Sequence, residues 1–240
     1  MKILAVECSE APASCAVWED GRVVCESFVR VGLTHSRTLM PMLQDMLKNA
    51  EVSLSEVDRL AVSVGPGSFT GLRIGIAAVK GLSLGADLPC VGVSTLEAAA
   101  YGSLPLKGLI CPVMDARCHQ VYNALFESDG ETLSRVCEDR ALTTDELAQE
   151  LAARRSARPD QPVWLTGNGV EVCMTAFGER MALAAAPSYW QSQRASCVAA
   201  LAAGRDAVPA GALLPCYLRL PQAERELKRR REASASDDVQ

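Results

Sequence analysis

The fold is decided by the stretch Gly65-Pro66-Gly67-Ser68-Phe69-Thr70-Gly71-Leu72-Arg73-Ile74-Gly75. It follows an apolar run over residues 60–64 and leads into a helix-like run that reaches Leu84. This order predicts a strand that turns on glycines into a helix, capped by Ser68 or Thr70, with free backbone N–H groups above the turn. Two interpretations stay open: a phosphate-binding turn, or a tight connection without a ligand. The spacing is neither a Rossmann fingerprint nor a P-loop.

Composition bounds the class of protein. The 240 residues carry a net charge of −5 and are 49% hydrophobic, enough for one large or two small domains but without a generally basic surface for nucleic acid. The apolar start at residues 1–6 runs into Glu7, which predicts a first strand rather than a signal peptide. The apolar run over residues 74–84 is far below bilayer length. We therefore expect a soluble, cytoplasmic protein that does not bind membranes.

The cysteines and histidines argue against a metal centre. The ten cysteines contain no Cys-x-x-Cys pair, and most lie in apolar runs, so we expect buried free thiols. The only two histidines are His35 and His119, too few for a histidine-rich metal site.

The order of expected elements occurs twice. In each half, three strands come first, and helices alternating with strands follow them. The first set of strands is expected at residues 3–7, 13–19 and 22–29, and the second at residues 109–114, 119–126 and 133–138. This predicts two similar α/β lobes with mixed sheets, over residues 1–104 and 105–220. We expect the basic and acidic tail, residues 221–240, to be flexible, and its basic run leaves contact with RNA as an alternative.

Small residues repeat at spacings of three or four along the second expected helix. Each glycine inside a helix costs about 1 kcal/mol relative to alanine, so several of them indicate close approach of another backbone. Internal packing and contact with another subunit both stay open. The small residues are Gly71, Gly75, Ala78, Gly81 and Gly85.

Several segments, in order across residues 1–226, resemble the bacterial TsaB (YeaZ) family. The most specific is the Gly-Pro-Gly-Ser-Phe-Thr-Gly run at residues 65–71. The resemblance implies the actin-like ATPase (ASKHA) fold, with two lobes each built on a mixed five-stranded-type sheet flanked by helices, the second smaller or degenerate. The other matching segments are residues 3–9, 34–36, 91–98, 112–117, 215–219 and 222–225.

The resemblance also implies a function. Members of this family are non-catalytic partners of a TsaD-type paralogue that forms N6-threonylcarbamoyladenosine in tRNA, next to the anticodon. A TsaE-type small ATPase joins them, they form homodimers in isolation, and tRNA is reached through the complex. Two alternatives remain: an actin-like kinase or ATPase that uses the glycine turn and Glu7, and a peptidase.

At two positions where active relatives carry metal-binding or catalytic residues, this sequence has different residue types. Where the metal-bearing paralogue has His-x-x-x-His, residues 94–100 offer no imidazole, and the family's usual Asp-Thr-Ser is Glu7-Cys8-Ser9 here. We expect no catalytic residue, no metal and no required cofactor, which leaves room for weak binding of ATP or ADP in the cleft or at a subunit junction. The candidate phosphate-binding residues are Glu7, Ser9, Gly65, Gly67, Ser68, Thr70, Gly71, Asp115 and Arg117.

Two further assignments follow. Asp115 and Arg117 form either a structural ion pair across the cleft or a ligand contact. The two helices of the first lobe are the expected dimer and partner interface, through His35, Leu39, Met42, Met46, Arg73, Ile74, Gly75, Ala78 and Gly81.

Overall fold

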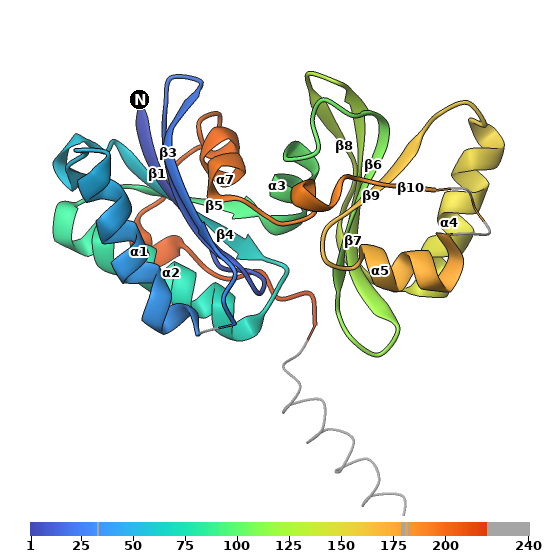
Figure 1. The fold of residues 1–240 in the computed structure, drawn as a ribbon, viewed down its shortest axis with the longest axis horizontal. Helices are drawn as coiled ribbons and strands as arrows, with labels where there is room; N and C mark the ends of the chain where they lie inside the picture. The colour runs from blue at the N-terminus through green and yellow to red at the C-terminus, as the bar shows by residue number, and fades with distance from the viewer. Residues whose placement is uncertain (33, 179–180, 182, 220–240) are drawn as a thin grey trace, which may run out of the picture.

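The computed structural model describes residues 1–32, 34–178, 181 and 183–219. The expected tail at residues 221–240, and the resembling segment 222–225, lie outside these ranges. Two lobes lie side by side, each built on one sheet, with the short helix α3 (Thr95–Tyr101) between them (Figure 1). Among the described helices, none combines the length and apolar character needed to cross a bilayer.

The first lobe is a five-stranded sheet in the order β3-β2-β1-β4-β5. The first three strands form an antiparallel meander, while β4 and β5 run parallel to β1. Asp20 and Gly21 join β2 to β3 with positive φ angles of 45° and 89°, as the Asp-Gly signal predicts. The strands are β1 (Lys2–Glu7), β2 (Ala13–Glu19), β3 (Arg22–Val29), β4 (Arg59–Gly65) and β5 (Cys90–Ser94).

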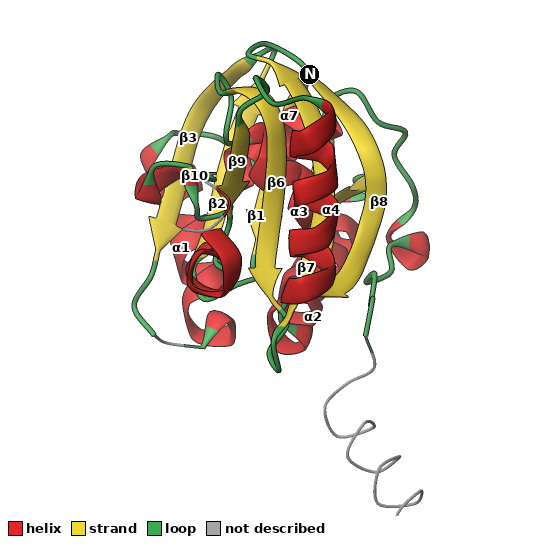
Figure 2. Ribbon diagram, turned by 90° about the vertical axis from the view of Figure 1, so that its right-hand side faces the viewer, coloured by secondary structure: helices red, strands yellow, loops and turns green. Residues whose placement is uncertain are grey.

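The second lobe repeats this order as β10-β9-β6-β7-β8, again five strands with an antiparallel meander and two parallel neighbours. Figure 2 looks onto this lobe, with α4 in front of the sheet. The prediction of two similar mixed sheets is confirmed. The strands are β6 (Lys107–Asp115), β7 (Gln120–Asp129), β8 (Leu133–Thr143), β9 (Val163–Thr166) and β10 (Ala184–Ala185).

Helices cover both faces of each sheet. In the first lobe, α1 (His35–Asn49) and α2 (Phe69–Ala86) pack on one face and α7 (Ala195–Ala202) on the other. In the second, α4 (Thr144–Ala157) and α5 (Val170–Cys173) pack on one face and α3 on the other. Short helical turns complete the chain: η1 (Leu54–Glu56), η2 (Met174–Gly178), η3 (Ser188–Trp190) and η4 (Ala210–Ala212).

The expected division into residues 1–104 and 105–220 does not describe the end of the chain. Helix α7 packs on β1, β2 and β4, with Val198 and Ala199 in one cluster with Ile3. Val208 then pairs with Cys90, and Leu213 joins the core beneath α2. The apolar sequence of α7 needs a sheet to cover, and the face of the first sheet opposite α1 and α2 provides one. Residues 195–213 therefore belong to the first lobe.

Candidate functional site

The turn after β1 places Glu7 in a closed environment. The Glu7 side chain is 2% exposed, and its carboxyl group accepts hydrogen bonds from the Ser9 backbone N–H at 2.5 Å and from the Ser63 hydroxyl. Burial raises the pKa of Glu7, and these hydrogen bonds only partly oppose the shift. A carboxyl group held in this way is not free to orient water or a hydrated metal ion.

The glycine turn is filled by the chain itself. The Ser68 N–H donates to the Ser9 carbonyl at 2.8 Å, and a β-carbon on Gly67 would stand 2.6 Å from the same oxygen. A β-carbon on Gly71 would overlap the Cys8 carbonyl, and one on Gly65 (φ +127°) would overlap the Cys216 carbonyl. Close approach of these three carbonyls explains the glycines. Most of the predicted phosphate-binding residues gather at this turn, and the close packing is what a tight strand-to-helix connection requires.

Only one of the two hydroxyl residues of this turn caps helix α2. Ser68 is the N-cap of α2, and its side chain accepts from the Gly71 N–H at 3.3 Å. Thr70 lies on the exposed side of the first helical turn. Of the two predicted caps, Ser68 is therefore the correct one.

Asp115 and Arg117 lie on the second-lobe side, and the structural ion pair predicted for them is wrong. The Asp115 carboxylate accepts from the backbone N–H of Arg117 at 2.7 Å, and no ion pair joins the two side chains, both of which are described. The Asn168 side chain accepts from the Asp115 N–H at 2.9 Å. Arg117, Cys118 and His119 follow with φ angles of 62°, 55° and 56°, so the turn geometry directs both charged side chains to solvent.

Charged side chains connect the lobes at the start of α3. Ser94 caps this helix and donates to Asp139 at 2.5 Å. The Glu97 carboxylate contacts Arg135 at 2.8 Å and Arg205 at 2.5 Å. Burial alone would raise the pKa of Glu97, but hydrogen bonds from the two arginines outweigh it and lower the pKa. No cluster suited to a metal ion occurs among the residues that the structure describes.

The predicted interface on α1 and α2 divides into buried and exposed residues. Leu39 and Met46 are 1% and 4% exposed and pack in the first-lobe core, and Gly75 faces Cys8 and Val62 of its own sheet. These three cannot line a docking surface, because the lobe's own sheet already covers them. Met42, Ile74 and Ala78 pack partly against the same core.

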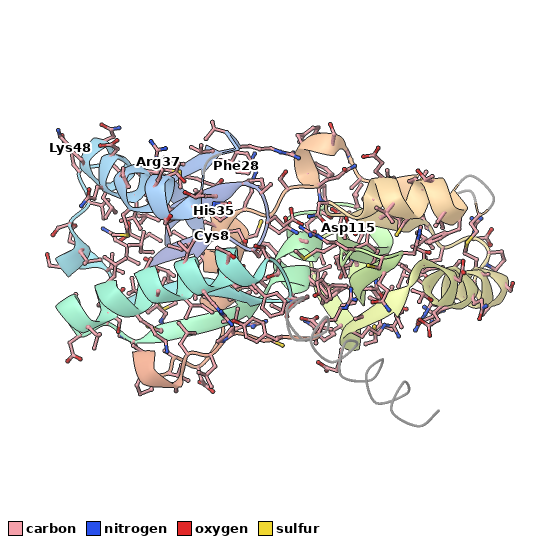
Figure 3. All side chains as sticks on the ribbon, turned by 90° about the horizontal axis from the view of Figure 1, so that it is seen from below. Cys8, Phe28, His35, Arg37, Lys48 and Asp115 are labelled. Atoms are coloured by element: carbon pink, nitrogen blue, oxygen red, sulfur yellow. The ribbon has the colours of Figure 1, made fainter. Side chains whose placement is uncertain are left out.

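His35 also has an internal partner. Its ring Nε2 lies 2.7 Å from the Glu10 carbonyl oxygen, and its Cδ2 atom lies beside Gly71. Figure 3 shows His35 and Cys8 in the first lobe, with Asp115 on the side of the second. The histidine joins the start of α1 to the turn after β1, whereas Thr34, the N-cap of α1, makes no side-chain capping bond.

The exposed part of the predicted interface on α2 is Arg73, near the start of the helix, and Gly81, near its end. Arg73 and Gly81 are exposed, and a β-carbon on Gly81 or Gly85 would meet nothing within 4 Å. Leu84, on the same stretch, is 82% exposed. The glycines of α2 therefore have two explanations: those near its start face the sheet, and those near its end lie open.

Five of the ten cysteines are buried, and all ten are free thiols. Burial raises the pKa of Cys15 and of Cys173 to about 12, which keeps these thiols protonated and unreactive. The prediction of buried free cysteines is confirmed for these five. Cys25, Cys137 and Cys197 are half-buried, and Cys118 and Cys216 are exposed.

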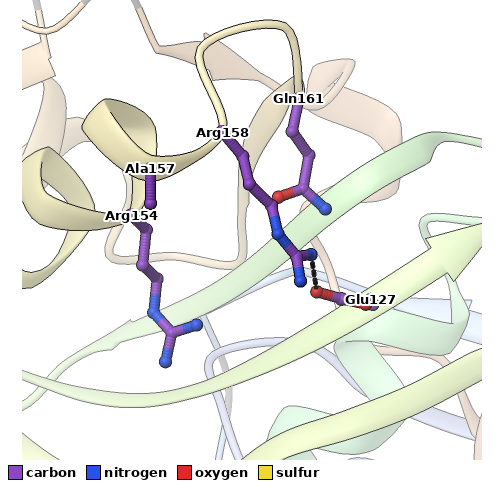
Figure 4. Close-up of a pocket in the computed structure, with 5 residues that line it drawn as sticks. All are labelled: Glu127, Arg154, Ala157, Arg158 and Gln161. Atoms are coloured by element: carbon purple, nitrogen blue, oxygen red, sulfur yellow. Dashed lines mark hydrogen bonds and ion pairs between the residues drawn. The ribbon is translucent and has the colours of Figure 1, made fainter.

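A separate shallow hollow lies on the second lobe and contains none of the predicted site residues. Figure 4 shows its lining, in which Arg158 pairs with Glu127 at 2.5 Å across the end of α4. The other lining residues are Arg154, Ala157 and Gln161.

Two sheets of identical strand order, joined through α3, define the actin-like ATPase fold. Residues 30–223 match the family model described as "TsaD: tRNA N6-adenosine threonylcarbamoyltransferase". The solved structure "YeaZ from Pseudomonas aeruginosa" superposes with a TM-score of 0.75 at 28% identity, over 90% of this chain and 99% of that one. The chain belongs to the TsaD family, and within it to the bacterial TsaB (YeaZ) type.

Sequence relatives agree with this placement. The "tRNA threonylcarbamoyladenosine biosynthesis protein TsaB" of Escherichia coli is 38% identical over 152 residues, which is 62% of this chain and 65% of that protein. The Bacillus subtilis protein of the same name is 29% identical over 93% of this chain and 96% of its own length. A "tRNA N6-adenosine threonylcarbamoyltransferase" from Solidesulfovibrio magneticus is 34% identical over 59% of this chain and 43% of its own.

Proposed function

We propose that this chain is a non-catalytic partner subunit in the biosynthesis of threonylcarbamoyladenosine in tRNA. It binds and supports a TsaD-type transferase, a TsaE-type small ATPase joins them, and tRNA is reached through the complex. The names of the TsaB relatives support the pathway. The family match supports kinship with the transferase.

The observation that carries the non-catalytic role is the close packing around Glu7 and the glycine turn. In the first lobe, Glu7 is buried and bonded to Ser63 and Ser9, and the glycine turn is packed against the carbonyls of Cys8 and Ser9. Nucleotide chemistry needs a free carboxylate and free backbone N–H groups near the phosphates. An active subunit must therefore supply the reacting groups.

The experiment is a reconstitution with components left out in turn. The chain is mixed with a TsaD-type subunit, a TsaE-type ATPase, tRNA, ATP, threonine, bicarbonate and the enzyme that makes the threonylcarbamoyl adenylate. We expect the modified nucleoside only when this chain and the transferase are both present, and no ATP turnover by this chain alone. ATP turnover by the isolated chain that Glu7→Gln abolishes would favour the kinase or ATPase alternative.

We place the docking surface, for a second copy or for the transferase, on the exposed end of α2. Gly81→Arg adds a long charged side chain where a β-carbon meets nothing within 4 Å, so the fold is unaffected. We expect it to split the homodimer and to block transferase binding, as followed by light scattering and pull-down. Leu84→Asp should act in the same direction, because Leu84 is the most exposed large apolar side chain described.

Gly204→Arg is the matched control. Its β-carbon position is equally open, but the residue follows α7 on the opposite face of the first sheet. It should leave both associations intact. If Gly81→Arg and Gly204→Arg behave alike, the assignment of the interface to α2 is wrong while the role in modification stands.

A further inference from the structure

The last described segment of the chain, residues 214–219, crosses from the first lobe to the second. The Cys216 N–H donates to the Val64 carbonyl at 2.7 Å, at the end of β4. Leu218 packs with the cluster formed by α3 and the adjoining face of the second sheet. The segment therefore runs from the glycine turn of the first lobe towards the second lobe (Figure 1).

On the first lobe, this segment holds an arginine of α2 in place. The Arg73 Nε donates to the Tyr217 hydroxyl at 2.9 Å, and the guanidinium carbon lies 5.7 Å from the centre of the Tyr217 ring. Phe69 stacks on the same ring, with 4.6 Å between the ring centres. Arg73 is exposed, and Tyr217 is 38% exposed, so the fixed guanidinium group lies at the surface.

On the second lobe, Arg219 is fixed to the turn between β6 and β7. Its guanidinium group donates to the Ala116 carbonyl and, at 3.5 Å, to the Arg117 carbonyl. Arg117 has a positive φ of 62° and an exposed side chain. Arg73, Tyr217, Arg219 and Arg117 are thus connected from one lobe to the other, and we call them the arginine strip.

Carboxylates of the described residues do not neutralise the arginine strip. Its three arginines form no ion pair within the described ranges, and Arg73 and Arg219 contact only a tyrosine hydroxyl and main-chain carbonyls. The Asp115 carboxylate, in the same turn as Arg117, accepts from the main-chain N–H of Arg117 instead. The described arginines that do pair with carboxylates are Arg135, Arg140, Arg154, Arg158, Arg194 and Arg205.

A row of unpaired guanidinium groups suits a partner that carries closely spaced negative charges. The phosphate backbone of RNA is such a partner, because arginine binds phosphate oxygens through parallel N–H donors. The whole chain has a net charge of −5, so attraction to RNA has to come from a local basic surface. The sequence also continues into a basic run, residues 225–231, soon after the strip.

We propose that the arginine strip binds the phosphate backbone of tRNA, so that this chain supplies part of the tRNA contact of the modification complex. The fixed positions of Arg73 and Arg219 favour such binding, because less side-chain freedom is lost when the contact forms. The choice of tRNA among RNAs rests on the proposed function. The test measures binding by the isolated chain without the modification reaction, so the two proposals can fail separately.

The experiment measures binding of the full-length chain to an unmodified tRNA transcript by fluorescence anisotropy at several salt concentrations. Arg73→Glu combined with Arg117→Glu reverses one charge on each lobe and should raise the dissociation constant at least about tenfold at low salt. For the wild type, the logarithm of the binding constant should fall linearly with that of the salt concentration. Arg73→Gln combined with Arg117→Gln should make this slope shallower by roughly 1.5, because about 0.7–0.9 is lost with each phosphate contact.

Arg22→Glu combined with Arg30→Glu is the matched control. It changes the net charge by the same amount at two exposed arginines, one in β3 and one directly after it. It should raise the dissociation constant less than about threefold, since charges outside the contact act only through the screened field of the protein. Equal weakening by the two charge-reversed pairs would overturn the proposal.

Arg117→Glu alone separates the arginine strip from the predicted interface on α1 and α2, because Arg117 lies on the second lobe. It should weaken tRNA binding at least about threefold and leave the oligomeric state unchanged in light scattering. Unchanged tRNA binding by this variant, or a wild-type protein without salt-dependent tRNA binding, would contradict the proposal. Loss of transferase binding in a pull-down, with tRNA binding intact, would instead assign the strip to an acidic protein surface.

Discussion

The carbonyl group of Cys8 lies so close to the α-carbon of Gly71 that no side chain fits between them. The end of β1 and the first turn of α2 are therefore in backbone contact. Gly71→Ala should lower the free energy of unfolding by about 1–3 kcal/mol, because the new β-carbon must push Cys8 aside.

Gly81 in the same helix is the matched comparison. Its β-carbon would meet nothing within 4 Å. Gly81→Ala should stabilise the protein by up to about 1 kcal/mol, the difference in helix propensity. Chemical denaturation of both variants checks the pair, and equal effects at the two positions would contradict the close approach.

The hydroxyl of Ser63 is the second test of the closed turn. Ser63 is 1% exposed and donates to the Glu7 carboxyl group. Ser63→Ala leaves a buried carboxyl oxygen with one donor fewer, which should cost about 1–3 kcal/mol of unfolding free energy. Ser36→Ala, at an exposed hydroxyl, should change the same quantity by less than about 0.5 kcal/mol.

Glu10, a buried side chain in the turn between β1 and β2, should give the protein a recognisable dependence on pH. Because burial raises its pKa from 4.5 in the unfolded chain to about 8, the folded protein keeps a proton that the unfolded chain has lost between these values. Its contribution to stability is complete below pH 4.5. It then falls by about 1 kcal/mol per pH unit until the folded protein also loses the proton.

Urea denaturation from pH 5 to pH 9 measures this effect. The unfolding free energy of Glu10→Gln should vary less over this range, since glutamine does not titrate, so the wild type should lose stability relative to the variant as pH rises. Parallel curves for the two proteins would show that Glu10 titrates normally.

The Glu97 contacts predict how firmly the lobes are joined. Glu97→Ala removes the partner that Arg135 and Arg205 share, although Arg135 keeps its ion pair with Asp139; the two arginine side chains are 25% and 32% exposed. We expect a loss of about 1–2 kcal/mol, less than for a fully buried pair because solvent screens the charges. Glu127→Ala breaks an exposed pair with Arg158 and should cost under about 1 kcal/mol. Thermal and urea unfolding of both variants test the difference.

Local signals in the sequence were sufficient for most of the fold. The meander before α1 and the glycine turn with its cap at Ser68 follow from turn chemistry and periodicity, which act over a few residues. The position of α7 does not follow in this way. The apolar pattern of α7 predicts that the helix packs against a sheet. It does not predict which of the two similar sheets has an uncovered face for it.

The site was less predictable, because its contacts join distant parts of the chain. Residue types were enough to single out Glu7 and the glycines as candidate site residues. They could not predict that the carbonyl groups of Cys8, Ser9 and Cys216 pack against those glycines. Glu10 was missed since an isolated glutamate is usually exposed, and its partner Gln193 is 183 positions away. The small-residue stripe of α2 could not reveal that half of it faces the sheet.

The return of α7 to the first sheet determines the order in which the protein can be completed. As the chain leaves the ribosome, the face formed by Ile3, Ala5 and Val91 stays bare until residues 195–202 have been synthesised. The lobe that begins first is therefore finished last, after the whole second sheet has been made. No single cut of the chain separates two self-sufficient halves, and a fragment ending at residue 104 should aggregate rather than fold.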